Sequence, residues 1–198
     1  VSIVYIQITR GAAPRTHAFP SERTTPTIYA FAKKFVRPEA ERWNQGYAAV
    51  TVPDRRWARA DVKTISLLPN VLAQQAAVEA GVADALMVRD GMALEGAHNN
   101  FFAVFDGTIV THPTSNVILP GITRGYVIEM AREMGFTVHE RAIQIEELQR
   151  ADEAFFTGTT TEVRPTVTID GRAVGDGRPG AVTLELAAEF QRRTADWA

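Results

Sequence analysis

Three of the four Asp-Gly dipeptides restrict the fold more than any other feature of this sequence, because each of the three lies between two short apolar runs. They occur at Asp90-Gly91, Asp106-Gly107 and Asp170-Gly171. A two-residue hairpin turn needs positive φ at both positions, and aspartate followed by glycine tolerates this well. Each dipeptide therefore predicts a β-hairpin, so the chain should contain a sheet built largely from antiparallel strands.

Helices are predicted where apolar residues recur at helical spacing and a glycine follows. The clearest case is SLLPNVLAQQAAVEAG, which ends at Gly81, and a second runs from Ile122 to Gly135. A short acidic helix is expected at 145–151 and an amphipathic helix at 180–193. The remaining apolar runs predict strands at 2–9, 27–35, 46–53, 136–142 and 153–157. Together these elements indicate an α+β or mixed α/β fold, rich in antiparallel strands and covered by three or four helices.

The composition excludes several classes of function. The 198 residues are 45% hydrophobic and carry a formal net charge of -2, so nothing favours nucleic acid or an anionic membrane surface. No apolar run reaches the roughly 18 residues of a membrane helix. The chain has no cysteine, which excludes disulfides and thiolate chemistry. The cytoplasm is the expected compartment.

Lys63 stands among apolar residues in the segment DVKTISLLPN, just before the first predicted helix. By their alternation, Val62, Ile65 and Leu67 are expected to be buried, which places Lys63 at the end of an apolar strand. A lysine in an apolar setting has a lowered pKa, and its free amine can form a Schiff base with an aldehyde. Taken alone, such a residue is more often a solvated lysine.

Two later segments offer hydrogen-bond donors to an anion. Gly121, Ile122 and Thr123 open the second predicted helix, where backbone N–H groups lack partners within the helix and the dipole is positive. Residues 158–161 are predicted to form a turn with three consecutive threonines, whose hydroxyls also donate. Each segment alone is more often a capped helix or a β-turn, but together they favour a phosphate site.

Glu95 follows an apolar strand and precedes a glycine. It is either a turn carboxylate in solvent or, if buried, the counter-ion of a cationic nitrogen, a bond worth about 1.5–3 kcal/mol. An amine for an aldehyde, a carboxylate for a ring nitrogen and donors for a phosphate are the groups that hold pyridoxal phosphate.

Five segments in order also resemble one known family. They are YIQITRGAAPRTHAFP, DVKTISLL, LEGAHNNFFAV, PGITRG and TGTTTEVRPTVTIDGRAVGDG. The sequence is similar to the class IV (fold type IV) pyridoxal-phosphate aminotransferases, and is most like the D-amino-acid aminotransferases. The resemblance runs over nearly the whole chain. It implies a strand-rich pseudo-barrel covered by helices, pyridoxal 5'-phosphate as cofactor, and a homodimer.

The resemblance also implies roles for single residues. Lys63 matches the lysine that carries the cofactor and moves the substrate proton, and Glu95 matches the carboxylate that keeps the pyridine nitrogen protonated. Asn100 matches a supporting asparagine, and Arg56 matches an arginine near the cofactor. The phosphate cup is matched by the backbone of Ile122 and Thr123 and the hydroxyls of Thr159 and Thr160.

Substrate binding is predicted in the segment APRTH. In the D-amino-acid enzymes an Arg-x-His pair binds the substrate α-carboxylate, and Arg15 and His17 stand in those places. A bidentate contact between arginine and carboxylate orients the substrate as well as binding it. The implied reaction transfers the amino group of a D-amino acid to a 2-oxo acid.

The sequence departs from the family in two ways. It starts directly as a strand with no initiator methionine, and nothing corresponds to the family's N-terminal small domain. Residues 1–198 are therefore expected to form a single cofactor-binding domain, with impaired activity. His98 also stands where the family has a small polar residue.

Several alternatives stay open at this point. Branched-chain aminotransferases and aminodeoxychorismate lyases share the fold, although Arg15 and His17 argue against both. R-selective amine transaminases are a third relative, and a non-catalytic fragment that binds the cofactor is a fourth alternative. No metal site is predicted, because the histidines lack ligand spacing, and the serine-hydrolase G-x-S-x-G motif is absent.

Overall fold

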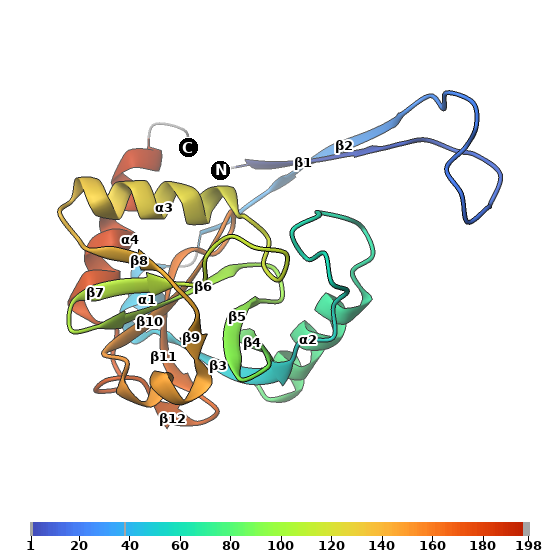
Figure 1. The fold of residues 1–198 in the computed structure, drawn as a ribbon. Helices are drawn as coiled ribbons and strands as arrows, with labels where there is room; N and C mark the ends of the chain where they lie inside the picture. Colours follow the sequence, from blue (N-terminus) through green and yellow to red (C-terminus); the bar gives the residue numbers. More distant parts are fainter. Residues whose placement is uncertain (1, 38, 196–198) are drawn as a thin grey trace. The chain divides into compact units, whose positions relative to one another are not determined.

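A computed structural model describes residues 2–37 and 39–195 of the chain (Figure 1). These residues divide into two compact units, 2–37 and 39–195. The prediction of a single cofactor-binding domain over 1–198 stays a prediction.

The first unit is a long two-stranded ribbon. β1 (Ser2–Thr9) pairs antiparallel with β2 (Thr27–Lys34), in register from Ser2 opposite Lys34 to Thr9 opposite Thr27. Both strands agree with the predicted ranges to within one residue. Apolar side chains from both strands are exposed, namely Val4, Tyr5, Ile6, Ile8, Ile28, Tyr29 and Phe31. The loop between the strands covers residues 10–26.

The second unit is built on a mixed sheet that closes on itself. The strands of this sheet lie side by side in the order β6, β10, β11, β3, β4 and β5, and β5 also pairs with β6, which closes the sheet. Most pairs are antiparallel, but β3 runs parallel to both β11 and β4. The predicted strand-rich pseudo-barrel is thus confirmed. The six strands are β3 (Tyr47–Pro53), β4 (Asp84–Arg89), β5 (Met92–Gly96), β6 (Asn100–Phe105), β10 (Glu153–Gly158) and β11 (Glu162–Ile169).

Short strands extend this barrel at its margins. β7 (Thr108–Thr111) pairs with β6, and β8 (Val138–Glu140) runs parallel to β7. β9 (Ile143–Gln144) pairs with β5, and β12 (Arg172–Ala173) with β11. The predicted strand 136–142 was too long, because its pairing with β7 covers three residues.

All three Asp-Gly turns form as predicted. Each aspartate has φ of 48° to 52°, and each following glycine has φ of 72° to 75°. These turns join β4 to β5, β6 to β7 and β11 to β12. Two consecutive positive φ values are the geometry that a tight hairpin demands.

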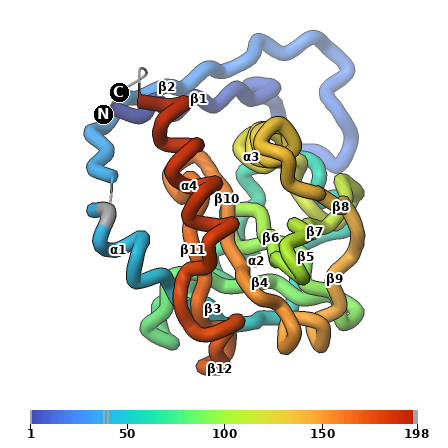
Figure 2. The backbone as a smooth tube through the Cα atoms, turned by 90° about the vertical axis from the view of Figure 1, so that its left-hand side faces the viewer, coloured from blue at the N-terminus to red at the C-terminus, as the bar shows by residue number. Residues whose placement is uncertain are grey.

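Helices cover the barrel, and each of the four predicted helical segments forms one. α2 (Leu68–Glu79), α3 (Ile122–Glu133) and α4 (Ala181–Thr194) match the periodic segments, and α4 lies along β10 and β11 (Figure 2). The acidic segment forms the 3₁₀ helix η1 (Ile145–Arg150), whereas the short α1 (Ala40–Gln45) was missed. None of the helices in the described residues has the length and apolar character to cross a membrane.

Two layers of core form because successive strand residues face opposite sides of the sheet. Phe102 of β6 stacks on Phe155 of β10, with ring centroids 4.8 Å apart, in the layer shared with α3 and α4. The next pair, Phe101 and Phe156, faces the other layer with centroids 5.1 Å apart. All four rings are buried, so β6 and β10 hold the centre of the unit.

We expect Phe102→Ala to lower the free energy of unfolding by about 3–5 kcal/mol, since it leaves a cavity against Phe155. Glu185→Ala is the control, because Glu185 is exposed on α4 and its loss should stay within about 0.5 kcal/mol. Equilibrium urea denaturation measures both. Equal losses in the two variants would contradict the core position of Phe102.

Candidate functional site

A pocket of about 1360 Å³ in the second unit brings four separate segments together. They are the loop 55–67 with the start of α2, the turn from β5 to β6, residues 119–123 before and within α3, and the end of β10. Seven of the residues predicted from the sequence line it, namely Arg56, Lys63, Glu95, Asn100, Ile122, Thr123 and Thr159. Thr160 is exposed in the turn after β10.

Lys63 lies in a loop, which corrects the prediction that it ends an apolar strand. Val62, Ile65 and Leu67 were expected to be buried, yet they are 40%, 65% and 50% exposed. The physical reason is that the side chains of this segment line the pocket instead of packing into the core. Apolar residues spaced along a pocket-lining loop therefore imitate the pattern of a half-buried strand.

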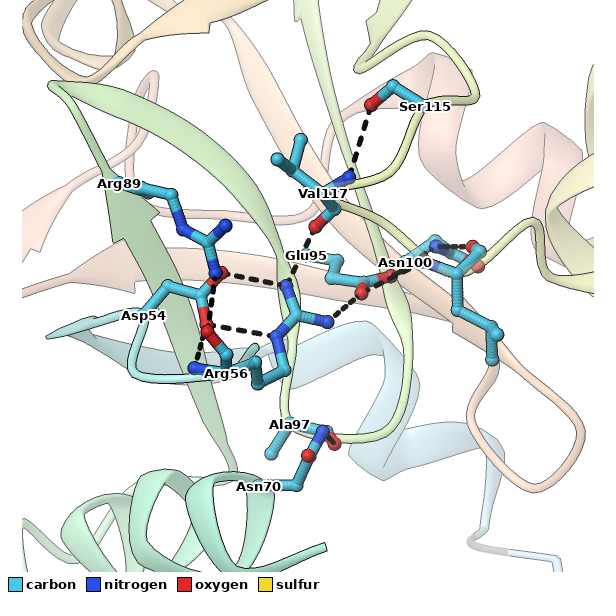
Figure 3. Close-up of polar contacts among 10 residues, drawn as sticks. Asp54, Arg56, Asn70, Arg89, Glu95, Ala97, Asn100, Ser115 and Val117 are labelled. Carbon is cyan, nitrogen blue, oxygen red and sulfur yellow. Dashed lines mark hydrogen bonds and ion pairs between the residues drawn. The ribbon is translucent and has the colours of Figure 1, made fainter. Parts of the chain in front are cut away.

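Glu95 is the buried acid of the pocket. It lies in β5, three per cent exposed, opposite Asn100 in the register of β5 and β6. Asn100 donates to one carboxylate oxygen at 2.8 Å, and the backbone N–H of Leu119 lies 3.0 and 3.1 Å from the two oxygens. Arg56 completes the set with an ion pair to Oε1 (Figure 3).

Burial raises the pKa of Glu95 to about 7, even though Arg56 and the Leu119 N–H act in the opposite direction. Desolvation disfavours the ionised form of a carboxyl group, whereas a nearby cation favours it. Glu95 therefore exchanges a proton near neutral pH, and a second cation at its surface would keep it ionised.

Arg56 is held on several sides, and its side chain is seven per cent exposed. Its Nε donates to Asp54 Oδ1 at 2.9 Å, and its NH2 donates to Asp54 Oδ2 at 3.0 Å and to the Val117 carbonyl at 2.9 Å. With NH1 bound to Glu95, four of the five guanidinium N–H donors are used. This geometry places Arg56 beside Glu95 as a fixed positive charge.

The start of α3 is fixed to Glu95 through Asn100. The Asn100 amide also donates to the Leu119 carbonyl at 2.9 Å. A Cβ at Gly121 would approach Asn100 Oδ1 to 2.1 Å, so glycine is needed there for the chain to pass. The first N–H groups of α3, including those of Ile122 and Thr123, therefore lie at a defined edge of the pocket and suit an anion.

Other groups in the pocket were not predicted from the sequence. Asn70 of α2 donates to the Ala97 carbonyl at 2.8 Å and so links the helix to the turn after Glu95. Thr157 lines the pocket with a buried hydroxyl that has no hydrogen-bond partner in the described part of the chain. His98 also lines it, with an exposed side chain. No local sequence signal marks the roles of Asn70 and Thr157, because the first depends on a contact between distant residues and the second on burial.

Arg15 and His17 belong to the first unit, in the loop that joins β1 to β2, and both are exposed. Nearby, the Thr16 hydroxyl donates to the Ala18 carbonyl at 2.8 Å, and Arg10 lies over the ring of Phe19. The substrate-binding role predicted for Arg15 and His17 stays a prediction.

Comparisons with known proteins agree on one family. The family model described as amino-transferase class IV matches residues 1–169. D-Alanine aminotransferase of Staphylococcus haemolyticus is 43% identical over 189 residues, which are 96% of this chain and 67% of that protein. The Bacillus licheniformis D-alanine aminotransferase is 40% identical over 95% of this chain and 66% of its own length. The chain thus spans about two thirds of these curated relatives.

Solved structures extend this likeness to the fold. The Escherichia coli branched-chain amino acid aminotransferase is 32% identical with a TM-score of 0.82. The match covers 96% of this chain and 64% of the Escherichia coli chain. A second branched-chain amino acid aminotransferase, solved with pyridoxamine 5'-phosphate, is 30% identical with a TM-score of 0.83, over the same shares. On the family match and these relatives, the chain belongs to the class IV aminotransferases.

Proposed function

We propose that this chain carries the pyridoxal 5'-phosphate site of a transaminase that moves the amino group of a D-amino acid to a 2-oxo acid. One observation carries the proposal: Lys63, a buried Glu95, the start of α3 and Thr159 line the same pocket. Because the chain spans about two thirds of its curated relatives, the activity of the whole enzyme is part of the proposal.

The residues of the pocket fit the cofactor in their chemistry. A primary amine suits the aldehyde, a buried carboxylate suits the ring nitrogen, and the N–H groups of α3 with the Thr159 hydroxyl suit the phosphate. Thr160 is a further donor in the same turn. When bound, the cofactor withdraws electrons from the substrate Cα and so makes its proton easier to remove.

Each residue then has a defined task. Lys63 binds the cofactor through its amine and moves the proton at Cα. Glu95 holds a proton at the ring nitrogen, and this cation would in turn keep Glu95 ionised, since an adjacent opposite charge lowers a carboxyl pKa. Asn100 and the Leu119 N–H orient the carboxylate.

The D-amino-acid substrate is favoured by the relatives and by one pair of residues. The D-alanine aminotransferases are 38–43% identical to the chain, and Arg15 and His17 match the expected carboxylate-binding pair. A branched-chain substrate is the second candidate, because the branched-chain enzymes resemble the fold closely. Comparing D-alanine, L-leucine and a simple chiral amine as amino donors would separate the D-amino-acid, branched-chain and amine transaminases.

A homodimer is also proposed, as the family resemblance implies. Two apolar residues of α2 that lie outside the pocket support it, because Leu72 and Val78 are 52% and 60% exposed, and exposed apolar patches usually meet a partner. The buried side of the same helix holds Ala73 and Ala77.

Borohydride reduction in the presence of pyridoxal phosphate should attach the pyridoxyl group to Lys63. Peptide mapping by mass spectrometry locates the label. The Lys63→Ala variant should lose it, while Lys33→Ala in β2 should label as the natural chain does. A label that stays in Lys63→Ala would refute the assignment.

Glu95→Gln should slow the half-reaction with D-alanine about tenfold to a hundredfold, because it removes a charge-assisted bond worth about 1.5–3 kcal/mol. Cofactor affinity should change much less. Single-turnover absorbance measures the rate, and Glu79→Gln, an exposed carboxylate at the end of α2, is the matched control. An unchanged rate in Glu95→Gln would show that Glu95 has a structural role.

Arg15→Gln should raise the D-alanine concentration for half-saturation by about 30-fold or more. Arg15 is exposed in the chain alone, but under this proposal the bound carboxylate takes it out of water, and losing one partner of such a charge pair costs about 2–5 kcal/mol. Acceptance of amines without a carboxylate should improve at the same time. Arg23→Gln, an exposed arginine in the same loop, provides the control. If Arg15→Gln and Arg23→Gln respond alike, Arg15 does not bind the carboxylate.

A further inference from the structure

A chain of alternating charges leads from β4 to the pocket (Figure 3). Arg89 NH2 contacts Asp54 Oδ2 at 2.8 Å, Asp54 binds Arg56, and Arg56 binds Glu95. Asp54 and Arg56, the two middle residues of this chain of charges, lie in the loop that begins directly after Pro53, the last residue of β3. Glu95 is the end of this chain that lies in the pocket.

Asp54 is fully enclosed by its partners. Its side chain has no exposed surface, and its oxygens accept from the Arg56 backbone N–H and from three guanidinium donors of Arg56 and Arg89. Its own backbone N–H donates to the Val88 carbonyl at 2.8 Å, which continues the pairing of β3 with β4. The carboxylate therefore has a fixed position relative to the barrel.

Asp54 and Glu95 differ in electrostatic character although both are buried. Burial by itself raises the pKa of Asp54, but the hydrogen bonds and charge of Arg56, together with Arg89, bring it below the ordinary value. Burial dominates at Glu95, whose pKa rises to about 7. Asp54 is thus a constant negative charge over the range in which Glu95 titrates.

We propose that Asp54 is a positioning residue of the site, which fixes the Arg56 guanidinium against Glu95 and is itself fixed by Arg89. Arg56 has only one N–H donor left after its bonds to Asp54, Glu95 and the Val117 carbonyl, so its task is to set the charge of Glu95 and not to bind substrate. This inference rests on the proposed function and deepens it, since it states what holds the Arg56 charge against Glu95.

The groups that act on Glu95 come from each neighbouring element. Arg56 and Asp54 approach from the loop after β3. Arg89 acts from β4 through Asp54 and also donates to the Arg56 carbonyl at 3.1 Å. Asn100 of β6 and the Leu119 N–H are neutral donors, and Lys63 lines the same pocket. Asp54 and Arg89 can each be replaced while the side chains of Glu95 and Arg56 stay unchanged.

Asp54→Asn is the decisive variant. An amide has one oxygen, and its NH₂ group would face a guanidinium that also donates, so the bidentate contact with Arg56 is lost. The Asp54 charge by itself raises the pKa of Glu95, so its removal alone would move the Glu95 titration downward. Arg56 acts on Glu95 by direct contact and therefore more strongly, so an Arg56 that no longer stays against Glu95 should move the titration upward by about one pH unit or more. Glutamate labelled with ¹³C at the carboxyl carbon reports this by NMR, with Glu95→Gln assigning the signal.

Glu140→Gln is the matched control, because it removes the carboxylate partner of another buried arginine, Arg124, outside the pocket. Glu140→Gln should lower the thermal stability, as Asp54→Asn should. It should leave the midpoint pH of the Glu95 titration unchanged. An unchanged or lowered midpoint in Asp54→Asn would show that Arg56 stays against Glu95 without Asp54 and would overturn the proposal, as would an equal shift in Glu140→Gln.

Arg89→Gln provides a second test if Asp54→Asn does not fold. Arg89 is partly exposed, and its loss leaves Asp54 bound to Arg56 while removing one positive charge from the group. The midpoint pH of the Glu95 titration should rise by less than in Asp54→Asn, and a fall or no change would contradict the proposal.

The titration is made on the 198-residue chain without cofactor. The prediction for Asp54 can therefore fail while the labelling of Lys63 succeeds, and the reverse also holds.

Discussion

The closure of the barrel between β5 and β6 is the interaction on which the rest of the second unit depends. The register between these strands consists of one residue pair, Glu95 and Asn100, supported by a backbone bond of 2.8 Å from the Gly96 N–H to the Asn99 carbonyl. The same two residues meet again through their side chains. The last contact that closes the sheet is therefore also the centre of the candidate site, and the pocket exists because the sheet returns to its first strand.

Local signals were sufficient for most of the fold. The three Asp-Gly turns required positive φ at two consecutive residues, and periodic apolar spacing defined α2, α3 and α4. The short α1 carries too little sequence to show a period, and β8 ends early because its length depends on its partner β7. Closure of the sheet came from the family resemblance, since pairing between distant strands leaves no mark in either strand alone.

The sequence predicted which chemical groups belong to the candidate site, but not the surroundings of those groups. The sequence singled out Lys63, Glu95 and Thr159, and the structure places all three around one pocket. The predicted setting of Lys63 was wrong, because apolar residues around a ligand pocket resemble those of a strand. No role was predicted for Asp54, whose importance lies in contacts with Arg56 and Arg89 that form only after β3 and β4 align.

Glu95 has a further consequence for the stability of the folded chain. In the unfolded chain its carboxyl group would ionise near its ordinary pKa of 4.5, whereas in the folded chain it keeps its proton until about pH 7. Unfolding therefore releases a proton between these values, and this residue makes the fold less stable as the pH rises through that window. A cation bound beside Glu95 favours its ionised form and so removes this loss of stability. A ligand that carries such a cation should therefore raise the melting temperature most above about pH 7, where the fold without ligand is least stable.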